Sequence, residues 1–108
     1  MHSRHVLAVT GALVAVTACQ ADDASVAALA TRLMNDYEGA EELTSEYRQF
    51  HISCGARALS DVPNDKIDAA LKAPTIPEIW AVLGSDTLDE YVRVCREGWL
   101  ELDDPPMP

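Results

Sequence analysis

Residues 25–59, SVAALATRLMNDYEGAEELTSEYRQFHISCGARAL, carry an apolar repeat of helical period. The repeat has a member at every seventh position: Val26, Leu33, Ala40, Tyr47 and Cys54. Other apolar residues follow these by three or four positions, which is the spacing of one helix face. Gly39 interrupts the stretch at a cost of about 1 kcal/mol relative to Ala. Because the apolar phase continues past Gly39, we expect one long helix here, or two nearly collinear helices.

Two short helices are expected beyond this stretch, each with its own start and stop signals. Residues 65–72 form an amphipathic segment that lies between Pro63 and Pro74. Residues 75–78, Thr-Ile-Pro-Glu, are a capping box with proline in the first turn, and Gly84 ends the helix that they start. Both helices are therefore predicted from local sequence alone.

A last helix is expected to follow Gly84 and to end near residue 102. Its N-cap candidates are Ser85, Asp86 and Thr87. Its apolar stripe consists of Leu88, Tyr91, Val92, Cys95, Trp99 and Leu102. No stretch alternates as a strand would, so we expect an all-α fold, a small domain of three to four helices preceded by an N-terminal signal helix.

The N-terminus has the parts of an export signal. Residues 1–5 are polar with one fixed positive charge, Arg4, and residues 6–18 are mainly apolar. These 13 residues fall short of the roughly 20 that a transmembrane helix needs. The segment closes on Val16, Thr17, Ala18 and Cys19, and this ending resembles the lipobox of bacterial lipoproteins. A plain secretory signal cut near residue 18 or 21 is the alternative.

The lipoprotein resemblance implies how the chain is processed and where it resides. Residues 1–18 would be the signal peptide, Cys19 would be acylated, and residues 19–24 would tether a helical domain of residues 25–102. Residues 103–108 contain three prolines and are expected to be a disordered tail. Gln20 is not the aspartate typical of inner-membrane retention, so the resemblance favours the periplasmic face of the outer membrane in a Gram-negative cell.

The chain has three cysteines, and the resemblance accounts for the odd number. With Cys19 carrying lipid, Cys54 and Cys95 remain, and an exported pair of this kind is expected to form a disulfide. The bridge would join the longest predicted helix to the last one. For a domain of this size, such a disulfide would supply much of the net stability.

The charge is strongly acidic. Without residues 1–18 the chain holds 7 Lys/Arg against 18 Asp/Glu, a formal charge of −11. Such a chain repels nucleic acid and anionic headgroups, so nucleic acid is not an expected partner. The expected contacts are the membrane, through Cys19, and a basic envelope protein.

A cluster of glutamates is the predicted interaction face. Glu38, Glu41, Glu42 and Glu46 fall on the polar side of the predicted long helix. Like charges four residues apart cost a few tenths of a kcal/mol each. The simpler interpretation is that these glutamates form a solvated face, and the more specific one is that they form a docking surface for a basic partner.

Few residues suggest other chemistry. His51 and Cys54 form an H-x-x-C pair that could hold zinc together with Cys95, but no fourth ligand has suitable spacing, so we expect no metal and no cofactor. The aromatic residues fall at core-compatible positions, and a ligand groove is the minority interpretation. No catalytic motif is present. We therefore expect a non-enzymatic binding module; the alternative is an acid- or stress-responsive periplasmic holdase, and an enzyme or metal carrier ranks third.

Overall fold

The computed structural model describes residues 22–108, and this part of the chain is all-α. Its elements in chain order are α2 (Asp23–Asn35), the short 3₁₀ helix η1 (Ala40–Glu42), α3 (Ser45–Leu59), α4 (Asn64–Lys72), α5 (Ile76–Leu83) and α6 (Ser85–Glu101). The all-α prediction is confirmed. The described residues hold five α-helices instead of three to four, because the stretch at 25–59 is split. The predicted signal helix and Cys19 lie outside the described residues.

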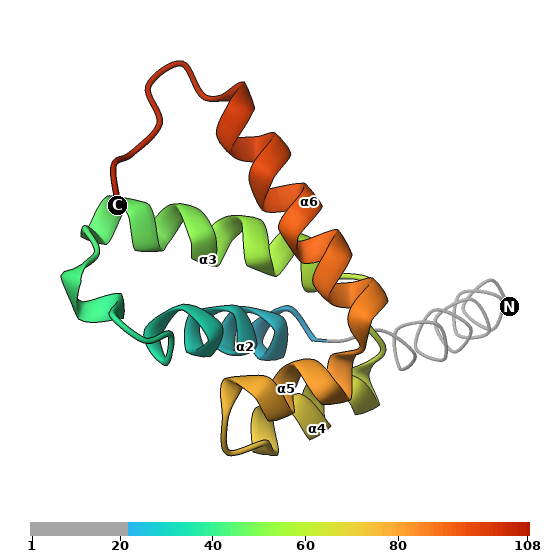
Figure 1. The fold of residues 1–108 in the computed structure, drawn as a ribbon. Coiled ribbons are helices and arrows are strands. Elements are labelled where there is room, and N and C mark those ends of the chain that lie inside the picture. Colours follow the sequence, from blue (N-terminus) through green and yellow to red (C-terminus); the bar gives the residue numbers. More distant parts are fainter. Residues whose placement is uncertain (1–21) are drawn as a thin grey trace, which may run out of the picture.

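The prediction of one long or two collinear helices over residues 25–59 is wrong. α2 ends at Asn35, and Gly39 takes a positive φ of 86° that favours glycine. Thr44 then starts a new helix, because its hydroxyl accepts a hydrogen bond of 3.2 Å from the Tyr47 N–H. The chain reverses between Asn35 and Thr44, so α3 returns along α2 and packs beside it (Figure 1).

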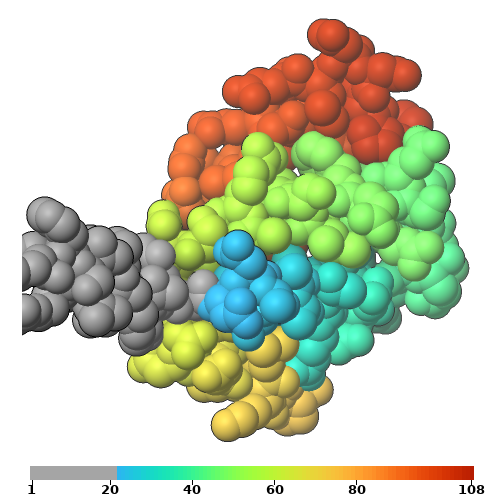
Figure 2. All heavy atoms as spheres, turned by 180° about the vertical axis from the view of Figure 1, so that it is seen from behind, coloured from blue at the N-terminus to red at the C-terminus, as the bar shows by residue number. Residues whose placement is uncertain are grey.

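An aliphatic core lies between α2, the end of α3, α4 and α5. Leu29, Leu59, Ile67 and Ile79 are fully buried in it. Figure 2 shows α2 flanked by α3 on one side and by the α4–α5 pair on the other. Arg32 also ties α2 to the end of α4, since its Nη1 donates to the Leu71 carbonyl at 2.8 Å, where a helix carbonyl lacks a partner.

The signals predicted for the shorter helices are largely confirmed. The Thr75 hydroxyl accepts from the Glu78 N–H at 3.3 Å and begins α5. Gly84 ends α5 with a φ of 94°. The N-caps predicted for the last helix are not used, because α6 begins at Ser85 directly after Gly84 and has no side-chain cap.

α6 runs antiparallel across α3 and is joined to it at three levels. Trp99 packs edge-on against Tyr47 and Phe50, with ring centroids 5.6 and 5.4 Å away. The Cys54–Cys95 disulfide lies next along the pair, with a Cα–Cα distance of 5.1 Å, which confirms the predicted bridge. Beyond it, the ring of Tyr91 lies against Gly55 of α3.

The last residues follow α6 as an irregular segment that turns back toward α3 (Figure 1). The Thr44 hydroxyl donates to the carbonyl of Met107 at 2.8 Å. The expected disorder of residues 103–108 stays a prediction. Between residues 22 and 108, no helix combines the length and apolar character required to cross a bilayer.

Candidate binding groove

The aromatic side chains lie outside the buried core. All six are partly or largely exposed: Tyr37, Tyr47, Phe50, Trp80, Tyr91 and Trp99. The prediction of core packing holds only in part, because Trp80 and Tyr91 cover the core without being buried in it. Aliphatic residues fill the interior, so the rings are left to line surfaces.

Four of these rings surround one groove. It has a volume of about 520 Å³ and lies between the end of α2, the first half of α3, α5 and the first half of α6. Its lining residues are Leu33, Met34, Tyr37, Leu43, Tyr47, His51, Ile76, Trp80, Leu88, Tyr91, Val92 and Pro108. The groove therefore depends on the chain reversal at Gly39, which brings the α2 end and the α3 start to the same side.

The walls of the groove are held by packing within and between helices. Leu33 and Met34 are buried residues of α2 on its inner side. Trp80 of α5 meets Tyr91 of α6 edge to face at 5.2 Å. Tyr37 is 57% exposed, which places it at the rim. The groove thus has an aliphatic base and an aromatic rim.

Gly55 allows Tyr91 to take its place in the wall. A Cβ at position 55 would stand 2.8 Å from Cε2 and 3.0 Å from the hydroxyl of Tyr91. Real Cβ atoms do not approach a ring this closely, so any larger residue at position 55 must displace Tyr91. Glycine in mid-helix costs stability, and here the cost is offset by the close approach of α6.

The side chains that line the groove are uncharged near pH 7. The lining includes no lysine, arginine, aspartate or glutamate. Burial lowers the pKa of His51, which keeps the imidazole uncharged at neutral pH. Burial also raises the pKa of Tyr91, which keeps its phenol protonated. The groove can therefore offer apolar area, ring faces and a few neutral polar edges.

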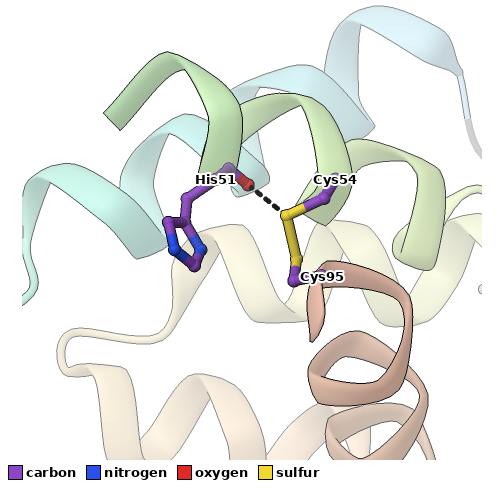
Figure 3. Close-up of side chains that lie close together, drawn as sticks. All are labelled: His51, Cys54 and Cys95. Carbon is purple, nitrogen blue, oxygen red and sulfur yellow. Dashed lines mark hydrogen bonds between the residues drawn. A yellow bond between two sulfur atoms is a disulfide. The ribbon is translucent and has the colours of Figure 1, made fainter. Parts of the chain in front are cut away.

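His51, Cys54 and Cys95 come together as their spacing suggested, with ligand atoms within 4.8 Å of one another. Figure 3 shows the imidazole and the disulfide side by side below α3, with the bridge reaching α6. Zinc binds cysteine as a thiolate, and neither sulfur of the disulfide is one. With the disulfide formed, His51, Cys54 and Cys95 do not make a metal site.

A short contact joins the disulfide to the helix backbone. Cys54 Sγ lies 3.3 Å from the carbonyl oxygen of His51. The sulfur carries no proton while it is bonded to Cys95, so the contact is a close sulfur–oxygen approach and not a true hydrogen bond. The contact involves the backbone of His51 and not its imidazole, which lines the groove.

The four glutamates do not share a helix face, and that part of the prediction is wrong. Glu38 lies in the chain reversal, Glu41 and Glu42 form part of η1, and Glu46 is in the first turn of α3. All four are exposed at this end of the α2–α3 hairpin. The expected repulsion along one helix is absent, and the carboxylate of Glu46 instead meets the positive end of α3.

The sequence pattern favours core packing for the aromatic residues and leaves a ligand groove only as the minority interpretation. It does not predict which residues line the groove, because rings at core-compatible positions fit either arrangement. The position of Tyr37 next to the Gly39 break is the one local sign of an exposed ring. Comparisons of the chain with protein-family models, with curated proteins and with solved structures found no match.

Proposed function

We propose that this chain is a non-enzymatic binding module of the cell envelope that takes a small ligand into the aromatic groove. The observation that carries the proposal is the groove itself, about 520 Å³ with a mainly apolar lining and a few polar edges. Ligand sites typically enclose roughly 300–1,000 Å³ and have this composition. The acidic charge of the domain favours a basic or cationic partner.

The chemistry of the lining supports binding over catalysis. A nucleophilic or acid–base mechanism needs a reactive side chain together with a base that a third group orients. Among its lining side chains the groove offers one imidazole, His51, and no serine, threonine, carboxylate or free thiol. The imidazole packs against the rings of Tyr47 and Phe50, at centroid distances of 4.6 and 5.4 Å, and no described acidic side chain hydrogen-bonds to it as the third member of a triad would.

A lipid anchor on Cys19 is part of the proposal. It is supported by the lipobox-like ending at Cys19 and by the Cys54–Cys95 disulfide, since disulfides persist in oxidising compartments. Helix α2 begins at Asp23, only four residues after Cys19. From Asp23 to Met34 the helix rises about 16 Å, so the groove would lie at the end of α2 far from the anchor.

The test is saturable binding of an uncharged probe to the folded domain. Nile red fluorescence should rise in a one-to-one titration with residues 22–108, because the neutral dye can enter an apolar groove. Tyr37→Ala and Val92→Ala should each weaken binding several-fold, since both side chains line the groove and are largely exposed.

Leu100→Ala is the matched control for these variants. Leu100 is 71% exposed on α6 and lies outside the groove lining. Its replacement should leave Nile red binding unchanged. Equal losses in all three variants, or binding that fails to saturate, would mean that the dye reports general surface hydrophobicity and that the groove is not a site.

An acid-responsive holdase is the second candidate, and the burial of His51 favours it. Because burial lowers the pKa of His51, protonation below neutral pH places a charge in the groove wall and destabilises the fold. A loosened domain would expose its apolar stripes. Suppression of aggregation of a client protein at pH 4 but not at pH 7 would support this function, and its absence at both would exclude it.

A further inference from the structure

We infer that the ligand of the groove is a free organic cation with alkylated nitrogen, of the quaternary ammonium class. This inference rests on the proposed function, because it names the chemistry that the same groove would select. It draws on three features of the described residues: the rings that line the groove, the charges that the lining lacks, and the acidic rim.

Four electron-rich rings reach the groove from four different segments. Tyr37 follows α2, Tyr47 belongs to α3, Trp80 to α5 and Tyr91 to α6. Tyrosine and tryptophan faces attract cations through the ring quadrupole, and sets of such rings form the known cages for quaternary ammonium groups. Rings from four segments can surround a ligand, whereas rings from one helix could form only one wall.

The lining contains nothing that would repel a cation or demand its hydration. No lysine or arginine lies in it, and His51 is neutral near pH 7 because burial lowers its pKa. The lining side chains also include no carboxylate to pair with a primary ammonium, whose N–H groups would lose water without gaining strong side-chain acceptors. An alkylated nitrogen has no such N–H groups, so it fits this lining best.

The rim supplies the complementary charge. Asp36 and Glu38 flank Tyr37 in sequence, and all three residues line the same surface depression beside the groove. Arg32 pairs with Asp36 at 3.1 Å, whereas Glu38 has no ion pair within residues 22–108. With a formal charge of −11 over residues 19–108, the domain attracts cations and repels anions as they approach.

The same charge argues for a free cation and against a lipid headgroup. A phosphocholine headgroup carries a phosphate next to its quaternary nitrogen, and that phosphate would meet Glu38 at the rim. The groove also lies at the end of α2 opposite to the proposed tether. Both observations favour a soluble ligand.

An isosteric pair of probes tests the inference. Choline and 3,3-dimethylbutan-1-ol have the same shape, but the nitrogen and its charge are replaced by carbon in the alcohol. We expect choline to bind residues 22–108 about five- to thirty-fold more tightly, the range that one or two cation–π contacts supply. Phosphocholine should bind more weakly than choline. Affinities are measured by amide chemical-shift changes at low salt, a method that suits weak ligands.

Variants at Tyr37 assign the preference to the rings. Tyr37→Phe keeps the ring face, so it should keep the preference for choline. Tyr37→Leu keeps the apolar bulk and loses the ring, so it should weaken choline binding and spare the alcohol. Tyr37 is 57% exposed, so neither change should unfold the domain.

The outcomes separate this inference from the proposed function. Equal binding of choline and the alcohol, or Nile red binding without choline binding, would overturn the cation class while the groove remains a site. A choline preference that survives Tyr37→Leu, or tighter binding of phosphocholine, would overturn it too. Failure of all probes, Nile red included, would reject the proposed function itself.

Discussion

Removal of the disulfide should destabilise the domain about as strongly as the most damaging single core substitutions. The bridge closes a loop with a sequence separation of 41 residues, and this loop contains α4, α5 and half of α6. In the chain-entropy model, freeing a loop of that length costs about 4 kcal/mol of unfolding free energy. For a domain of this size, each kcal/mol corresponds to about 4–8 °C in Tm, so a fall of roughly 15–30 °C is expected.

The assay is urea unfolding followed by far-ultraviolet circular dichroism. The oxidised wild type is compared with Cys54→Ala/Cys95→Ala and with the wild type held in reductant. Both sulfurs are buried, so the double variant loses the crosslink and some packing, whereas reduction loses the crosslink alone. The difference between the two samples therefore measures the packing part.

Three results would refute this reasoning. A loss below about 1 kcal/mol in both samples would mean that the loop is not the constraint that its length implies. Two free thiols in the protein as isolated from an oxidising medium would mean that Cys54 and Cys95 do not form the bridge. A loss confined to the double variant would assign the stability to packing and not to the crosslink.

Three further predictions follow from single sites. Gly55→Ala should lower the Tm of the domain, because the alanine Cβ would stand 2.8 Å from the Tyr91 ring. Alanine normally stabilises a helix by about 1 kcal/mol relative to glycine, so a gain in Tm would contradict the packing described here. His51 has a lowered pKa, so the unfolded chain binds its proton first and stability should fall as pH drops below about 6.5. His51→Gln should flatten this fall in urea titrations at pH 7.5 and 5.5, and an unchanged slope would count against it; the groove lining has no aspartate or glutamate to complicate the comparison. Cys19→Ser should release the full chain from membranes and abolish fatty-acid labelling, whereas continued labelling would reject the proposed anchor.

The parts of the fold that depend on local signals were predictable. The side-chain cap at Thr75 and the glycine stop at Gly84 act within one helical turn, and the structure uses both. The disulfide was predictable as well, because both cysteines lie on apolar stripes and the proposed acylation of Cys19 leaves them as the one remaining pair.

The chain reversal was not predictable from periodicity. The stripe at Val26, Leu33 and Cys54 runs through both helices, because both turn apolar residues toward the interior after the reversal. A continuous phase thus does not distinguish one long helix from a hairpin. The combination of Gly39 with an N-cap at Thr44 was the better signal, since it marks a stop and a start within a few residues.

The groove was less predictable still, because its residues meet only in the folded chain. The end of α2 lies about 50 residues from α6 in sequence, and the hairpin and the disulfide decide their approach. The positions of the aromatic residues do not distinguish a groove from a core, since an apolar ring at helical spacing is consistent with either. The buried cluster consists of aliphatic residues, and the rings of Trp80 and Tyr91 pack against it from outside.

Because α6 supplies one wall of the groove, loss of the disulfide should also weaken ligand binding in the domain while it remains folded. α6 contributes Leu88, Tyr91 and Val92 to the groove, and the bridge at Cys95 lies one turn beyond Tyr91. Without the bridge, α6 is held against α3 by non-covalent packing alone, including the Gly55–Tyr91 and Trp99 contacts, so the wall can shift outward. In cold samples whose circular dichroism shows that Cys54→Ala/Cys95→Ala is still helical, Nile red affinity should fall several-fold. Unchanged affinity in the folded variant would show that packing alone sets the position of α6 and that the disulfide contributes only to stability.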